Sequence, residues 1–140
     1  MTIEQSTEIK FSLSSDKEIG LMSAPGVFTP NATTTLLIQA VKKTISEPAT
    51  MLDLGCGTGV VGLALHLHGL INSPLYASDL STLAVLCCRE NFARYGCPAE
   101  VRGGSLFEPW LGQKFDVIID DISGIAQDKD AERFFLKAIA

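Results

Sequence analysis

A glycine-rich segment near the middle of the chain has the composition of a loop that holds a ligand through its backbone. It reads Asp53-Leu54-Gly55-Cys56-Gly57-Thr58-Gly59, after one apolar run and before another with helical spacing. Glycine accepts positive φ angles and lets a ligand approach the main chain closely, so we expect a strand, a cofactor-binding turn and a helix. The glycines alone do not choose the cofactor, because Gly57-x-Gly59-x-x-Gly62 also satisfies the dinucleotide fingerprint.

Two features of this loop disfavour a dinucleotide. The carboxylate of Asp53 would oppose a pyrophosphate at the helix N-terminus. The third glycine of a dinucleotide loop would fall at position 60, which is Val60, whereas Gly62 lies inside the expected helix and most simply packs on the sheet. S-adenosylmethionine carries a sulfonium and an α-ammonium and no phosphate, and an acidic loop favours it.

A second acid, Asp79, follows twenty residues after Gly59 at the end of the next expected strand. A carboxylate there can accept hydrogen bonds from both hydroxyls of a ribose. It could instead cap the following helix, although Ser81 could provide that cap. Together with the glycine loop, Asp79 indicates ribose binding.

Strands and helices must alternate to position these residues. The apolar pattern predicts a hairpin of two short strands, a helix after Asn31, two strand–helix units, a third strand and a last strand–helix pair. The expected strands are 9–13, 18–22, 50–54, 75–78, 100–103 and 115–120, and the expected helices are 32–45, 59–68, 81–95 and 130–140. This order predicts an α/β fold, a doubly wound Rossmann-like and mostly parallel sheet with helices on both faces.

The chain divides into N-terminal strands and a loop, residues 1–30, and a cofactor-binding domain, residues 31–140. The strand at 115–120 would lie at an open sheet edge, which proteins normally pair or cover. We therefore expect either that the domain is incomplete at its C-terminus and lacks further strands, or that the N-terminal hairpin covers this edge.

Five segments resemble the class I S-adenosylmethionine-dependent methyltransferases, and among them the small-domain group. This group includes release-factor glutamine methyltransferases and RNA guanine and adenine methyltransferases. The similar segments are 26–30, 51–59, 79–96, 104–109 and 115–119, in the order that the family has them. The resemblance implies S-adenosyl-L-methionine as the cofactor and no metal ion. It implies cofactor contacts from Thr29, Asp53, Gly55, Cys56, Gly57, Gly59, Asp79, Leu80, Ser105, Leu106 and Asp120.

The chain departs from the family at two places. Ser105 stands where an acid usually meets the adenine amino group, and its hydroxyl offers only a neutral acceptor. Asp121-Ile122-Ser123-Gly124 replaces an Asn-Pro-Pro-Tyr motif that holds a planar amino group and stacks a ring on it. Asp121 can still accept a hydrogen bond from an amino group, and we expect it to be the catalytic residue. Asp120 and Asp121 could equally be strand-end acids without a catalytic role.

These observations leave three hypotheses. The first is methyl transfer, to an amino nitrogen of a protein or RNA or to a small molecule. The second is a truncated or degenerate methyltransferase that acts as a cofactor-binding or structural module. The third, a nicotinamide-dependent oxidoreductase, is opposed by Asp53 and by the glycine register.

Composition limits the partners. The net charge is −5 and the 11 lysines and arginines are scattered, so this segment offers no basic patch for nucleic acid. Cys56, Cys87, Cys88 and Cys97 lack paired zinc spacing and predict buried thiols. No apolar run reaches the ~20 residues of a membrane helix and the first residues do not form a secretory signal, so we expect no membrane partner and a cytoplasmic protein.

Overall fold

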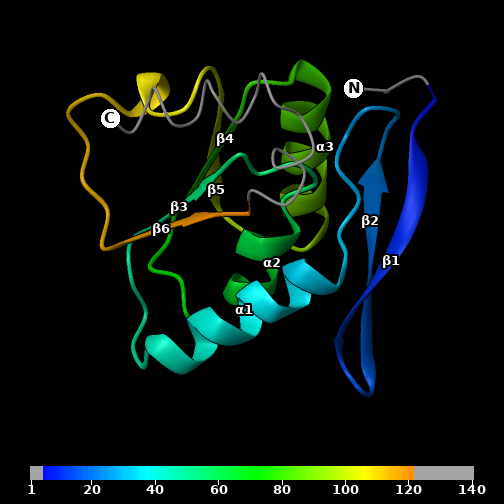
Figure 1. The fold of residues 1–140 in the computed structure, drawn as a ribbon, viewed down its shortest axis with the longest axis horizontal. Helices are drawn as coiled ribbons and strands as arrows, with labels where there is room; N and C mark the ends of the chain where they lie inside the picture. The colour runs from blue at the N-terminus through cyan, green and yellow to red at the C-terminus, as the bar shows by residue number, and fades with distance from the viewer. Residues whose placement is uncertain (1–4, 122–140) are drawn as a thin grey trace.

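A parallel sheet forms the centre of the structure, a computed structural model that describes residues 5–121 (Figure 1). Its strands are β3 (Met51–Leu54), β4 (Leu75–Asp79), β5 (Ala99–Gly103) and β6 (Val117–Asp120), and their spatial order is β5-β4-β3-β6. The chain moves from β3 outward to β5 and then crosses back to the other side of β3. The strand order therefore reverses between β3 and β6, which is where open α/β sheets bind ligands.

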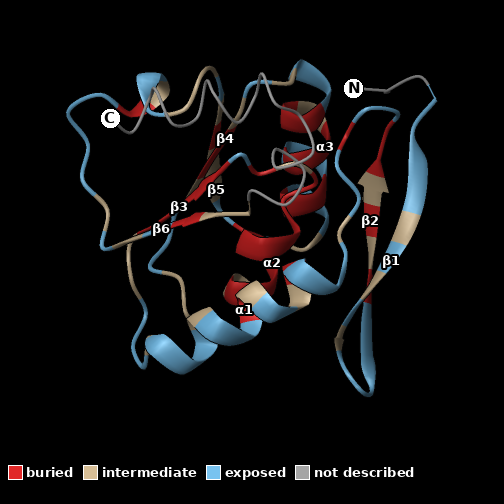
Figure 2. Cartoon of the chain, viewed as in Figure 1, coloured by how far each residue is buried: buried red, intermediate tan, exposed pale blue. Residues whose placement is uncertain are grey.

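Two helices pack on one face of this sheet, α2 (Val60–Leu67) and α3 (Thr82–Arg94), and α1 (Ala32–Thr44) packs against α2. Caps begin α1 and α3: Asn31 accepts a hydrogen bond from the Thr34 amide, and Ser81 accepts one from the Ala84 amide. The buried side chains of α2 and α3 form the main core together with Met51 of β3; in Figure 2 α2 is largely red, whereas α3 carries both red and pale blue. Successive crossovers in one direction place their helices on the same face.

The sequence predicted helices on both faces of the sheet. Within residues 5–121, α-helices lie on one face only. The opposite face carries a second core of Leu52, Leu54 and Trp110, against which Tyr76 and Phe115 pack. Trp110 ends the short 3₁₀ helix η1 (Glu108–Trp110), and its ring meets those of Tyr76 and Phe115 edge to face. Alternation along β3 explains the two cores, because successive side chains of a strand point to opposite faces.

The N-terminal hairpin forms a separate antiparallel sheet of β1 (Thr7–Ser14) and β2 (Lys17–Ser23). It lies beside α3, at the far side of the molecule from β6 (Figure 1). Ile19 and Leu21 of β2 enter the main core. The suggestion that this hairpin covers the β6 edge is wrong, because its apolar face is used against the helical layer. Within the described residues β6 pairs with β3 alone.

The other strands and helices expected in this region are confirmed, with element ends shifted by one or two residues. The helix expected at 130–140 lies outside the described residues. Among residues 5–121, no helix combines the length and apolar character needed to cross a membrane.

Candidate functional site

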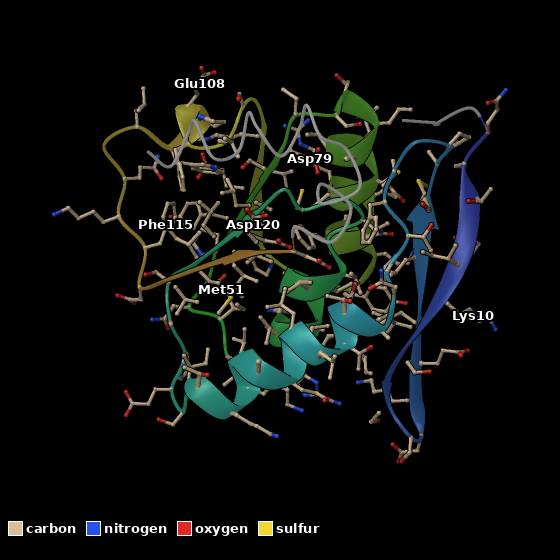
Figure 3. The ribbon with its side chains drawn as sticks, viewed as in Figure 1. Lys10, Met51, Asp79, Glu108, Phe115 and Asp120 are labelled. Carbon is tan, nitrogen blue, oxygen red and sulfur yellow. The ribbon has the colours of Figure 1, made fainter. Side chains whose placement is uncertain are left out.

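A cavity of about 670 Å³ opens at the carboxyl ends of β3, β4, β5 and β6. Its walls come from the loops that follow these strands, and the segment before α1 adds a further wall through Val27, Phe28 and Pro30. Figure 3 labels Asp79 and Asp120, at the ends of β4 and β6, toward the upper half of the view, with Met51 at the start of β3 below them. The cavity therefore lies where the strand order reverses.

The structure brings nearly all of the predicted site residues to this cavity. Those that line it are Asp53, Gly55, Cys56, Gly57, Asp79, Leu80, Ser105, Leu106, Asp120 and Asp121. Thr29 and Gly59 are absent from its lining: Thr29 is exposed, and Gly59 is buried beneath the loop. The predicted ligand contacts of these residues remain predictions.

The glycine loop turns through three left-handed residues, Gly55 (φ 70°), Gly57 (φ 54°) and Gly59 (φ 85°). Hydrogen bonds within the protein fix the turn: the Cys56 amide donates to the carbonyl of Ser78 at 2.8 Å and the Gly59 amide to that of Cys56 at 2.7 Å. Gly59 is needed for packing, because a Cβ there would lie 2.9 Å from the Cys88 sulfur and 2.9 Å from the Phe92 ring. Contacts within the protein thus define the shape of the turn.

Asp79 holds the loop and faces the cavity at the same time. Its Oδ2 accepts a hydrogen bond from the Gly57 amide at 2.9 Å, and its Oδ1 accepts one from the Ser81 amide at 2.9 Å. Ser81 itself caps α3 through the Ala84 amide, so Asp79 is not the helix cap that the sequence left open. Each carboxylate oxygen can accept a further bond, which leaves Asp79 able to bind two hydroxyls.

Asp53 has a structural role that the sequence did not reveal. Its side chain is 2% exposed, and its Oδ2 accepts a hydrogen bond from the Gly62 amide in the first turn of α2 at 3.2 Å. Burial raises the pKa of this carboxyl well above its usual range, the Gly62 bond opposes the shift, and the charges of Asp120 and Asp79 add to it. Asp53 therefore stabilises the start of α2 from β3, where Gly59 has no side chain to cap the helix.

Asp120 and Asp121 end β6 at the cavity wall. Oδ2 of Asp120 is buried and has no partner among the described residues. Burial, then the neighbouring charges of Asp121 and Asp79, raise the pKa of Asp120 to about 6. Asp121 accepts a hydrogen bond from the Thr34 hydroxyl at 3.0 Å, which links it to the first turn of α1.

Thr34 and Asn91 were missed in the sequence. Thr34 is 1% exposed and lines the cavity, and its place as the third residue of a capped helix is the signal that would have found it. Asn91 is fully buried on the apolar face of α3, where a polar residue signals a specific hydrogen-bonding duty. Trp110 does not line the cavity; its Nε1 donates to the Ser78 hydroxyl at 2.8 Å, so it anchors the loop beneath Asp79.

The charge of the cavity has one sign. Four aspartates line it, Asp53, Asp79, Asp120 and Asp121, and no lysine, arginine or histidine of the described residues does. The remaining wall is largely apolar, with Leu106 at a positive φ of 43°, a conformation that non-glycine residues seldom adopt outside functional sites. The described residues contain no grouping of side chains suited to a metal ion. The site is thus built for a ligand that carries positive charge and hydrogen-bond donors.

Known proteins resemble this chain in sequence and in fold. Ribosomal RNA small subunit methyltransferase C of Alcanivorax borkumensis is 33% identical over 102 residues, which cover 70% of this chain and 30% of that protein. A T. thermophilus 16S rRNA N2 methyltransferase, solved with AdoMet and guanosine, superposes with a TM-score of 0.73 at 18% identity, over 85% of this chain and 33% of its own. Ribosomal protein L11 methylase of Lactobacillus delbrueckii subsp. bulgaricus gives a TM-score of 0.60 at 28% identity, over 76% and 55%.

The chain spans about a third of the length of the curated relative. The family model for the methyltransferase small domain matches residues 18–133. This match runs from β2 past the end of β6 and includes every wall of the cavity. The chain therefore belongs to the methyltransferase small domain family.

Proposed function

We propose that this chain binds S-adenosyl-L-methionine in the cavity and supports transfer of its methyl group to an amino nitrogen of a protein or RNA. The observation that carries the proposal is the position of Asp79, fixed by two backbone amides at the rim of a cavity whose other charges are also negative. The oxygens of Asp79 fit a ribose diol, and the carboxylates fit an ammonium and a sulfonium.

The bound cofactor would supply a methyl group on a sulfonium sulfur, which the acceptor nitrogen takes up as the carbon–sulfur bond breaks and the thioether leaves. The protein's task in such a reaction is alignment, which contributes much of the acceleration when reacting groups are held in place. Asp121 would orient an acceptor amino group by accepting its N–H, and Thr34 holds Asp121 for this purpose. Asp120, with a pKa of about 6 and a buried oxygen without a partner among residues 5–121, would accept a second N–H at the same wall.

The names of the relatives support a macromolecular acceptor, since they refer to ribosomal RNA and to ribosomal protein L11. A protein amine suits the negative cavity directly. An RNA acceptor would need cations from outside the cavity wall, because none of the described lining residues is basic.

Isothermal titration of the chain with S-adenosylmethionine tests the binding step, with Asp79→Asn as the decisive variant. Asparagine replaces one carboxylate oxygen of Asp79 with an NH₂ group, which would face the N–H of Gly57 or of Ser81 and cannot accept its hydrogen bond. Losing a hydrogen bond to a charged acceptor amounts to about 1.5–3 kcal/mol, so we expect the dissociation constant to rise about 10-fold to 150-fold.

Glu47→Gln is the matched control, because it removes the same charge from an exposed position before β3, at the opposite end of the sheet. Absence of binding to the wild-type chain would refute the proposal. Retained binding without methyl transfer to any protein or RNA in a broad panel would favour the cofactor-binding module instead.

A further inference from the structure

Three residues on one face of α3 support the glycine loop from below. Cys88, Asn91 and Phe92 stand three and four residues apart and so point the same way. The Cys88 sulfur and the Phe92 ring both lie against Gly59, where each would be 2.9 Å from a Cβ. The remaining contact, between Asn91 and Thr58, is polar.

The carboxamide of Asn91 makes three hydrogen bonds to two other segments, and both of its N–H groups donate. Its Nδ2 donates to the carbonyl of Thr58 at 2.8 Å and to that of Met22 at 2.9 Å. Its Oδ1 accepts a bond from the Met22 amide at 2.7 Å. Only this orientation of the side chain pairs both carbonyls with the N–H groups, so the arrangement is unambiguous.

The same carboxamide therefore joins the loop to the hairpin. Met22 presents to Asn91 the edge of β2 that does not pair with β1, so Asn91 takes the place of a neighbouring strand. One turn further along α3, the Tyr95 hydroxyl bonds to the amide and carbonyl of Gly20 at 2.8 and 2.9 Å. Tyr95 thus anchors the hairpin as Asn91 does, but it does not reach the loop.

The structure assigns to Asn91 the role of a positioning residue that couples the N-terminal hairpin to the cofactor loop. The carbonyl of Thr58 lies between Gly57, whose amide Asp79 holds, and Gly59, which is the N-cap of α2. Fixing that carbonyl fixes the peptide plane that follows it, and with it the turn of the loop. This inference rests on the proposed function for its ligand, but the geometry it describes exists in the ligand-free chain.

The first experiment compares Asn91→Ala with Tyr95→Phe without any ligand. Both variants remove a hairpin anchor on α3, and only the first removes the tie to Thr58. We expect hydrogen exchange at the Gly57 and Gly59 amides to be at least about tenfold faster in Asn91→Ala than in the wild type, equivalent to about 1.4 kcal/mol, and unchanged in Tyr95→Phe. Equal effects of the two variants would show that Asn91 acts only through general stability and would overturn the proposal.

The second experiment titrates both variants with S-adenosylmethionine at a temperature at which each is folded. We expect the dissociation constant to rise about tenfold in Asn91→Ala and to stay within about twofold in Tyr95→Phe. Failure of the wild type to bind would refute the proposed function, whereas the exchange rates of the ligand-free variants would still decide the role of Asn91.

A third measurement needs no variant and so does not depend on whether Asn91→Ala folds. Coupling between two sites is reciprocal, so a ligand in the loop must also stabilise the hairpin contact. S-adenosylmethionine should slow exchange of the Met22 amide, which Asn91 holds, more than that of the Gly20 amide, which Tyr95 holds. Equal protection of the two amides would overturn the proposal.

Discussion

Replacing Gly59 by alanine tests whether the loop is constrained by packing on α3. Gly59 has a φ of 85°, and a Cβ there would lie 2.9 Å from the Cys88 sulfur and 2.9 Å from the Phe92 ring. The left-handed backbone costs an alanine about 1–2 kcal/mol. Crowding adds about 1–3 kcal/mol, because Cys88 and Phe92 are themselves buried and have no room to move. We expect a total loss of about 2–5 kcal/mol in the free energy of unfolding.

Gly69→Ala separates these two contributions. Gly69 has nearly the same φ, 76°, and nothing lies within 4 Å of a Cβ at that position. Its loss should therefore be about 1–2 kcal/mol, and the reduced freedom of the unfolded chain is the same in both variants. Urea unfolding followed by circular dichroism measures both values from the midpoint and slope. Equal losses would refute the idea that the loop is seated on Cys88 and Phe92.

Two further predictions concern the wall formed by Asp120 and Asp121. Burial raises the pKa of Asp120 from 3.8 to about 6, so the folded chain binds the proton of this carboxyl more tightly than the unfolded chain does. The bound proton therefore contributes to the free energy of unfolding. This contribution is complete below pH 3.8 and is lost as the pH rises through about 6. Asp120→Asn should therefore raise the melting temperature relative to wild type at pH 7.5 but not at pH 4, and an equal effect at both values would contradict this. Thr34→Val should lower the free energy of unfolding by about 1.5–3 kcal/mol because it removes the donor to Asp121, whereas Thr34→Ser should retain most of it; equal urea midpoints for the two variants would argue against the bond.

The fold was predictable because local signals were strong. Asn31 and Ser81 begin helices by capping them, and glycines stand where the chain must turn with positive φ. The position of the hairpin was not predictable, since two short strands carry no information about which surface they cover. The contacts that place it, from Asn91 and Tyr95, join residues about 70 positions apart in the sequence.

The sequence identified most of the residues that line the cavity but not what each of them does there. Motif and strand-end position identified Asp53, Asp79 and Asp120, because parallel strands bring their carboxyl ends to one edge. The role of each aspartate depends on the direction in which its side chain points, which the sequence does not give. Asp53 reaches the amide of Gly62 in α2, whereas Asp79 reaches back across the loop to Gly57. Gly59 is buried against α3 and does not line the cavity, and its predicted ligand contact remains a prediction.

The hydrogen bonds of the loop bear on the choice between cofactors more directly than its glycines do. A loop that binds pyrophosphate must present its amides, and those of the next helix, to the anion. Here the amides of Cys56 and Gly59 donate to backbone carbonyls, and that of Gly57 donates to Asp79. The Gly62 amide, in the first turn of α2, donates to Asp53. These donors are committed within the protein, and the charged side chains among the described residues that line the cavity are all carboxylates. A glycine turn of this kind can bind a phosphate through its amides. Here the named amides bond within the protein, and the carboxylates favour a ligand that donates hydrogen bonds.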